Sequence, residues 1–209
     1  MTMSNDPFTE PETTREEILA AAYRALRTRG YGDVTISAIG EEFEKSPSLI
    51  YRHYDSKDDL IVECLGYLLD RFESQQIDAE IEDPRDRLDA FVRTSLVEEI
   101  PDDDRQFVAT LVELRARAVH DEAYRRHFTE SDRALKQYLA SILRSGIDSG
   151  EFLECDPDRV AETLLVMITG VAIRRSTTTD EAWIPAVRAE IDSYLEERVY
   201  AERADRSTE

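Results

Sequence analysis

Apolar residues recur three and four positions apart along almost the whole chain, and no sustained alternation with a period of two interrupts them. This spacing places apolar side chains on one face of a helix, whereas alternation is typical of a strand. Glycine and proline, which interrupt helices, are scarce, with 7 of each in 209 residues. The sequence therefore predicts an all-α protein.

The composition supplies a core without cross-links, because hydrophobic residues make up 41% of the chain and aromatic residues 8%. Cys64 and Cys155 stand far apart, with no Cys-x-x-Cys pair or Cys/His cluster. We interpret them as two buried small hydrophobes, and expect neither a disulfide framework nor a metal site. No apolar run of about 18 residues and no basic-then-apolar leader occurs, so we expect a cytoplasmic protein without a membrane span.

The chain is strongly acidic, with 46 Asp and Glu against 26 Lys and Arg and a net charge of −20. Lysine occurs only at Lys45, Lys57 and Lys136. An acidic, lysine-poor surface suits a cytosol of very high salt, where the Debye length falls to about 3 Å at 1 M and self-repulsion is screened. The composition therefore favours a halophilic protein, with an ordinary acidic protein as the alternative.

The charge is unevenly distributed, which matters for nucleic-acid binding. A net charge of −20 by itself disfavours nucleic acid, because the phosphate backbone attracts Lys and Arg. Residues 45–57, however, carry Lys45, Arg52 and Lys57 against one acidic residue, Asp55. This basic window is a candidate contact with nucleic acid.

Helix start and stop signals divide the chain. The Thr-Thr-Arg-Glu-Glu sequence at 13–17 contains a capping box and precedes a helix that Gly30 ends. Thr35 can cap a short helix, and the Ser-Pro pair at 46–47 marks the start of a second one. The other expected helices run over 56–76, over three segments between 84 and 149, onward from 157, and over 180–203. The second short helix should bury Ile50 and Tyr54, which leaves Ser48, Leu49, Tyr51, Arg52 and His53 on its outer face.

The two short helices resemble the N-terminal helix-turn-helix signature of the TetR family of transcriptional regulators. The resemblance rests on Thr-Ile-Ser-Ala-Ile at 35–39 and on residues 46–60. Its most specific part is Tyr-x-His-Tyr-x-x-Lys-x-x-Leu at 51–60, which follows an amphipathic first helix. The turn departs from the family, because it has Glu-Lys at 44–45 in place of glycine and an aliphatic residue. The resemblance covers residues 13–65, and beyond them the chain is similar in layout only.

The resemblance implies a three-helix helix-turn-helix unit that a long helix joins to a C-terminal helical bundle. The expected parts are a disordered tail (1–12), a DNA-binding domain (13–58), a ligand-binding and dimerisation domain (59–203) and a second disordered tail (204–209). The expected function is that of a ligand-responsive regulator, a repressor that binds a pseudo-palindromic double-stranded DNA operator as a homodimer. A small-molecule effector of unknown identity is the other expected partner, and no cofactor is expected.

The family positions also imply roles for single residues. In a helix-turn-helix the second helix enters the major groove while flanking groups hold phosphates. The expected phosphate contacts, all hydrogen-bond donors, are Thr35, Tyr51, His53 and Lys57. The residues expected to face bases are Pro47, Ser48, Leu49 and Arg52. Arg52 can donate to guanine O6 and N7, and Leu49 can touch a thymine methyl. Core packing of Tyr51 and Tyr54, and a plain surface role for His53, are the alternatives.

Two sets of apolar residues have expected roles in the rest of the chain. The last two helices carry stripes suited to a subunit interface, formed by Val160, Leu164, Met167, Val171, Val187, Ile191, Tyr194 and Leu195. Gly170 would let a partner's backbone approach. The proposed walls of an effector pocket are Phe91, Phe107, Leu111, Leu114, Tyr124, Phe128, Met167 and Trp183. For the pocket set and for Gly170 the alternative is ordinary packing within one subunit.

Two other classes of function are weighed against DNA binding. An enzyme is not expected, because His120 and His127 lie about 10 Å apart along a helix, too far to share a metal ion. The chain also has no Gly-x-Ser-x-Gly, His-Glu-x-x-His or glycine-rich phosphate loop. The stronger alternative is a similar helical protein that binds a protein partner, which the acidic charge favours. The combination of Tyr51, His53 and Lys57 argues for DNA instead.

Overall fold

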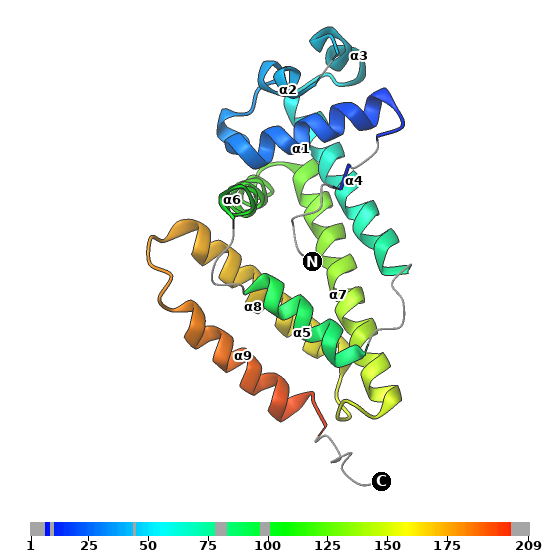
Figure 1. The fold of residues 1–209 in the computed structure, drawn as a ribbon, viewed down its shortest axis with the longest axis vertical. Coiled ribbons are helices and arrows are strands. Elements are labelled where there is room, and N and C mark those ends of the chain that lie inside the picture. The colour runs from blue at the N-terminus through cyan, green and yellow to red at the C-terminus, as the bar shows by residue number, and fades with distance from the viewer. Residues whose placement is uncertain (1–6, 9–10, 44, 78–82, 97–100, 202–209) are drawn as a thin grey trace. The chain divides into compact units, whose positions relative to one another are not determined.

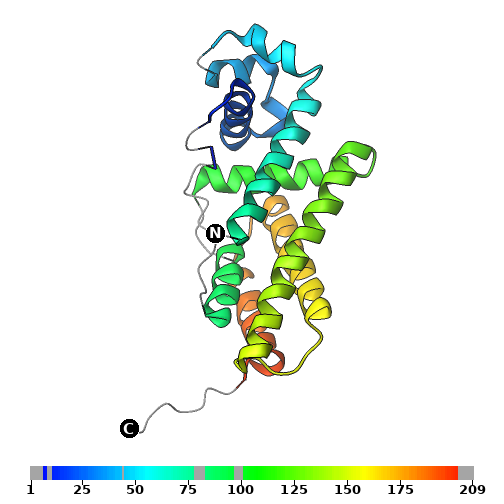
Figure 2. The same ribbon diagram turned by 90° about the vertical axis from the view of Figure 1, so that its right-hand side faces the viewer.

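The computed structural model describes residues 7–8, 11–43, 45–77, 83–96 and 101–201. Within these ranges every element is helical apart from one β-bridge between Phe152 and Tyr200 (Figures 1 and 2), which confirms the all-α prediction. None of the helices, as far as they are described, is long and apolar enough to cross a membrane. In chain order they are α1 (Thr14–Asp33), α2 (Ile36–Glu42), the 3₁₀ helix η1 (Pro47–Leu49), α3 (Ile50–His53), α4 (Lys57–Ile77), α5 (Pro84–Ser95), α6 (Asp102–Arg117), α7 (Glu122–Ser149), α8 (Pro157–Thr177) and α9 (Ile184–Arg198).

The chain forms two compact units. The N-terminal unit comprises residues 2–78 and 100–131, so it holds α1 to α4, α6 and the first part of α7. The C-terminal unit comprises residues 79–99 and 132–209, with α5, the rest of α7, α8 and α9. The domain boundary expected after residue 58 therefore falls inside α4 and inside the N-terminal unit.

Within the N-terminal unit, α2 and α3 lie on one side of α1 and α6 lies on the other (Figures 1 and 2). The predicted capping box starts α1, because the Thr13 hydroxyl accepts from the Glu16 amide and the Glu16 carboxylate accepts from the Thr13 amide. The helix breaks at Gly30, where φ is 72° and ψ is 168°. The break requires glycine because of its backbone conformation, and a Cβ at this position would also displace the side-chain amide of Gln106 on α6.

The second short helix of the motif begins as a 3₁₀ turn, η1, and continues as α3. It starts where predicted, because the Leu49 amide donates to the Ser46 carbonyl over 2.9 Å. The Ser46 hydroxyl lies 2.9 Å from the Ser48 hydroxyl, and α3 has no side-chain cap. Ile50 and Tyr54 are buried, as expected. The helix therefore turns the predicted face toward the core.

The expected disordered tails lie mostly outside the described residues, as does Glu44 in the turn. Phe8 is described, and it is only 4% exposed. Its ring stacks on that of Tyr67 with centroids 4.6 Å apart, and it lies 5.7 Å from the ring of Tyr23. The expectation of a disordered segment is wrong at Phe8, because these two rings offer it an apolar surface.

The four helices of the C-terminal unit share one core, to which they contribute Leu88, Leu139, Leu164 and Ile191 among others. The start of α8 is as predicted, with the Asp156 carboxylate accepting from the Arg159 amide over 3.1 Å and proline in the first turn.

The last helix, α9, is shorter than the 180–203 predicted from its apolar stripe. Pro185 has no backbone N–H to donate, so it fits the first helical turn and not a helix interior. After α9, Tyr200 enters the β-bridge and its hydroxyl donates to Asp89 over 2.5 Å. These contacts end the helix, because they hold the chain extended where the stripe would have continued.

Candidate functional site

The outer face of η1 and α3 carries the side chains predicted to meet DNA. Ser48, Tyr51, Arg52 and His53 are exposed, and Tyr51 is 64% exposed. Leu49 is half-buried and packs against the core of the N-terminal unit. This face therefore presents hydroxyl, phenol, guanidinium and imidazole groups, each of which can donate a hydrogen bond.

Two further candidates lie where the short helices begin. The Thr35 hydroxyl accepts from the Ala38 amide over 3.1 Å and so caps α2. Thr35 is exposed, and its hydroxyl hydrogen can still donate to a phosphate. Pro47 opens η1, where its missing N–H is harmless.

Arg52 differs from the other cations around it. Among the arginine and lysine side chains of residues 11–43 and 45–57, it alone makes no hydrogen bond, ion pair or ring contact with a described residue. The partners of the others are Glu63 for Arg15, Glu42 for Arg24, Asp104 for Arg27, Glu41 for Arg29, Glu17 for Lys45 and Tyr31 for Lys57. Arg52 is thus a free guanidinium in a chain with a net charge of −20.

One carboxylate, that of Glu63 on α4, holds the end of α3. Its Oε1 accepts from the Tyr54 hydroxyl and from Arg15 Nε, both over 2.5 Å. Burial alone would raise the pKa of Glu63, but these hydrogen bonds and the Arg15 charge keep the pKa below its ordinary value. Burial and the nearby carboxylate raise the pKa of Tyr54. The end of α3 is therefore held to both α1 and α4 by these hydrogen bonds.

A second carboxylate, that of Asp58 in the first turn of α4, contacts residues of three other segments. Its Oδ1 accepts from the hydroxyls of Tyr31 and Tyr124 over 2.7 and 2.8 Å, and its Oδ2 lies 3.3 Å from Arg117 Nη2. Burial opposes ionisation, but the two hydroxyls and the Arg117 charge lower the pKa of Asp58. Burial first, and then the Asp58 carboxylate, raise the pKa of Tyr31 to about 12. Asp58 therefore connects the ends of α1 and α6 and the start of α7.

Lys57, a predicted phosphate contact, rests on Tyr31. Its Nζ lies 3.9 Å from the centroid of the Tyr31 ring and donates to the Tyr31 carbonyl over 3.1 Å. An ammonium has three N–H donors, so one bond to a carbonyl leaves donors for a phosphate. Because Asp58 holds the hydroxyl of the same tyrosine, it fixes the ring that supports Lys57.

Sequence reasoning missed this Asp58 cluster. Asp58 had only the signal of an acid in the first turn of a helix, which the helix dipole favours. Its tyrosine partners lie 27 and 66 positions away, at Tyr31 and Tyr124. A pairing at that separation has no local pattern, so no spacing rule predicts it.

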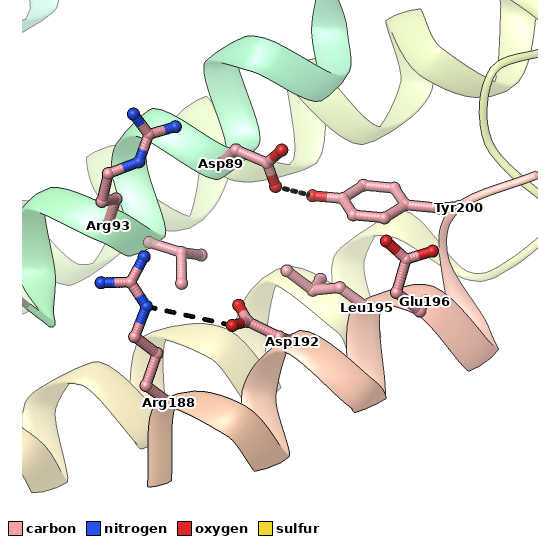
Figure 3. Close-up of a pocket in the computed structure, with 8 residues that line it drawn as sticks. Asp89, Arg93, Arg188, Asp192, Leu195, Glu196 and Tyr200 are labelled. Atoms are coloured by element: carbon pink, nitrogen blue, oxygen red, sulfur yellow. Dashed lines mark hydrogen bonds and ion pairs between the residues drawn. The ribbon is translucent and has the colours of Figure 1, made fainter. Parts of the chain in front are cut away.

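The proposed walls of the effector pocket divide between the two units. Phe107, Leu111, Leu114, Tyr124 and Phe128 pack in the N-terminal core, whereas Phe91, Met167 and Trp183 pack against the C-terminal core. Leu114 and Tyr124 are 0% exposed, which agrees with the alternative of ordinary packing. A pocket that the structure does contain lies in the C-terminal unit (Figure 3), and none of these eight residues lines it.

The predicted interface residues also fall into two groups. Those already buried by their own chain are Val160, Leu164, Val171, Ile191 and Leu195, while Met167, Val187 and Tyr194 keep part of their surface exposed. A side chain buried within its own unit has no surface left for a partner, which corrects the expectation for the first group. The exposed apolar residues of α8 are others, Val166 at 65% and Ile173 at 41%. Sequence reasoning missed them because the buried stripe dominates the apolar pattern of α8.

Two known protein families match successive parts of the chain. Residues 18–64 match the family described as bacterial regulatory proteins, tetR family. Residues 84–199 match the family described as BetI-type transcriptional repressor, C-terminal. The first match covers the helix-turn-helix and the second covers α5 to α9.

Individual proteins and structures that are similar to this chain are transcriptional regulators as well. A regulator named BetI from Brucella anthropi is 28% identical over 192 residues, which are 90% of this chain and 95% of that protein. The crystal structure of a TetR transcription regulator from Haloarcula marismortui is 34% identical, with a TM-score of 0.74 over 88% of this chain and 97% of that one. A regulator from Saccharomonospora viridis, solved in complex with choline, is 25% identical, with a TM-score of 0.71 over 90% and 98%. The chain belongs to the TetR family of DNA-binding transcriptional regulators and is similar to its BetI-type repressors.

Proposed function

We propose that the protein represses transcription as a homodimer that reads a pseudo-palindromic operator with Arg52 and is released from it by a small molecule. The unpaired guanidinium of Arg52 carries this proposal. The four arginines between residues 11 and 43 each pair with a carboxylate, whereas the Arg52 side chain has no partner among the described residues. A cation left free on a recognition helix is suited to a guanine, whose O6 and N7 accept from both arms of a guanidinium.

The phosphate contacts support the same orientation. Thr35 at the start of α2, Tyr51 and His53 on α3, and Lys57 at the start of α4 each place a donor beside the recognition helix. Phosphate contacts fix the position and register of a protein on DNA but carry no base information. We assign Ser48, Leu49 and Pro47 to the groove together with Arg52, because they share η1 and the first turn of α3.

The proposed dimer contact is the exposed face of α8. Val166, Gly170 and Ile173 are spaced four and three positions apart, so they lie on one side of the helix. A Cβ added at Gly170 would meet no described atom within 4 Å outside the backbone of its own helix, so packing among the described residues does not require this glycine. A partner's backbone approaching α8 would require it. Met167, Val187 and Tyr194 are assigned to the margin of the same interface.

Sedimentation of Val166→Asp tests the dimer. A charge placed in a subunit interface without a partner costs several kcal/mol, so the variant should be monomeric and folded. Val119→Asp is the matched control, because Val119 is also 65% exposed but lies at the corner between α6 and α7. A dimer that survives Val166→Asp would place the interface elsewhere.

The relatives supply the first effector to test. One was crystallised with choline, and the C-terminal half of this chain matches the BetI-type domain. Choline should release the protein from its operator, with potassium chloride at equal concentration as the control for ionic strength. If choline and potassium chloride at equal concentration dissociated the protein–operator complex to the same extent, choline would be excluded as the effector.

Selection from a randomised DNA pool at high potassium tests the function as a whole. The protein should enrich a sequence with two half-sites related by two-fold symmetry, because a dimer presents two recognition helices to the major groove. If a folded dimer enriched no sequence, the DNA contacts assigned here would be wrong, and the protein-partner alternative would take their place.

A further inference from the structure

The pocket of about 310 Å³ in the C-terminal unit is lined by Tyr200 and by apolar and charged side chains (Figure 3). Val92 on α5 and Leu195 on α9 are both buried and form apolar lining. The charged residues come from the same two helices, and Tyr200, which follows α9, completes the lining. The volume falls at the lower end of the range of about 300 to 1,000 Å³ that is typical of small-molecule sites.

Most of the acidic groups in this pocket already have a partner. Asp89 accepts from the Tyr200 hydroxyl over 2.5 Å, and Glu196 pairs with Arg85 over 2.5 Å. The Arg85 guanidinium also lies 4.0 Å from the centroid of the Tyr200 ring. The charge of Glu196 is therefore balanced by Arg85, whereas Asp89 keeps its negative charge, because its partner is a neutral hydroxyl.

The arginines of the pocket are the groups with free capacity. The side chain of Arg93 on α5 makes no hydrogen bond, ion pair or ring contact with a described residue. Arg188 on α9 has only a long ion pair, 3.9 Å from its Nε to Asp192. In Figure 3 both arginine side chains lie at one end of the pocket, and Asp89 and Tyr200 lie at the other. The end with the two arginines is therefore the more cationic, and the end with Asp89 is acidic.

We infer that this pocket binds a small organic monocarboxylate. A guanidinium recognises a carboxylate through two parallel hydrogen bonds, which the free Arg93 can supply and Arg188 can reinforce. The body of the ligand would lie on Val92 and Leu195, out of water. The acidic end would repel a second negative charge, so dicarboxylates should be rejected. This ligand has the opposite charge to choline, so the site is distinct in chemistry from the effector proposed above.

Calorimetric titration of the 209-residue protein with benzoate tests this site. Benzoate should bind, whereas benzamide, which has the same shape without the charge, should not bind measurably. Terephthalate, with a second carboxylate at the far end, should bind more weakly than benzoate. Arg93→Gln should weaken benzoate binding about tenfold or more, because it removes a charge-assisted hydrogen bond. Arg188→Gln should weaken it less, since Asp192 already shares that guanidinium.

Arg133→Gln is the matched control, because Arg133 is an exposed arginine of α7 with no interaction to a described residue and lies outside the pocket lining. It should leave benzoate affinity unchanged. The absence of benzoate binding, equal binding of benzamide, or unchanged affinity in Arg93→Gln would each overturn the assignment. None of these outcomes depends on DNA binding or on choline. Neither Arg93 nor Arg133 has contacts to lose, so both variants should fold.

Discussion

The two units use their charged side chains in different ways. In the N-terminal unit the carboxylates of Asp58 and Glu63 each join segments that are distant in sequence, and one guanidinium on the recognition helix is left free. In the C-terminal unit the ion pairs lie mostly at the surface, as for Arg144 and Asp158, whose side chains are 53% and 59% exposed. Exposed pairs contribute little to stability. In the first unit carboxylates therefore join distant segments, whereas in the second unit an apolar core does so.

The largest effect is expected in the C-terminal core. Ile191 is 3% exposed and packs within its own unit, so Ile191→Asp should unfold that unit, at a cost of about 3–5 kcal/mol, and should not merely separate subunits. Thermal unfolding followed by circular dichroism measures this. Val166→Asp should keep its folding transition in the same experiment. If the Ile191→Asp variant were folded and monomeric, Ile191 would belong to the subunit interface after all.

Gly30→Ala should destabilise the N-terminal unit more than most surface substitutions. Its φ of 72° and ψ of 168° belong to a region open almost only to glycine, which costs other residues about 1–3 kcal/mol, and Gln106 would have to move as well. Gly32→Ala is the control, because a Cβ at that position meets nothing within 4 Å. Chemical denaturation should give Gly30→Ala a clearly lower free energy of unfolding than both the wild type and the control.

Asp58→Asn tests the role of the half-buried Asp58 carboxylate. It should lower the free energy of unfolding by about 1–2 kcal/mol at neutral pH, a figure reduced for the 39% exposure of the side chain. Asp55→Asn, at an exposed acid with no contact to a described residue, should have almost no effect. Equal effects of the two variants would show that the cluster does not stabilise the unit.

The same substitution should also change how the free energy of unfolding depends on pH in acid. The pKa of folded Asp58 lies below its ordinary value of 3.8, so its contribution is complete above that pH and is lost as the pH falls through the lowered value. The difference between wild type and Asp58→Asn should therefore shrink in strong acid. A difference that stays constant from neutral to strongly acidic pH would contradict the assigned hydrogen bonds.

A smaller effect, spread over the whole chain, is expected from salt. The net charge of −20 should make the fold more stable as potassium chloride rises toward molar concentrations, because repulsion among the carboxylates is screened. The thermal midpoint should climb by several degrees over this range. A flat or falling midpoint would favour the ordinary acidic protein over a halophilic one.

Local patterns predicted those features that depend on neighbours in sequence. Apolar spacing predicted the helices, the capping box at Thr13 started α1, and the motif at 51–60 located the exposed face of α3. Contacts between distant segments had no such signal. The partners of Asp58 and the pocket between α5 and α9 both depend on how the helices pack. Apolar stripes likewise do not distinguish a core from an interface, which is why Ile191 was misplaced.

Fluorescence anisotropy with the selected operator and an unrelated duplex distinguishes the proposed base contact of Arg52 from the proposed phosphate contact of Lys57. Arg52→Ala should lose about 1–3 kcal/mol of discrimination between the two duplexes. Lys57→Ala should weaken both by similar factors and reduce the salt slope by about 1. Equal losses on both duplexes for Arg52→Ala, or no change in either, would contradict the account.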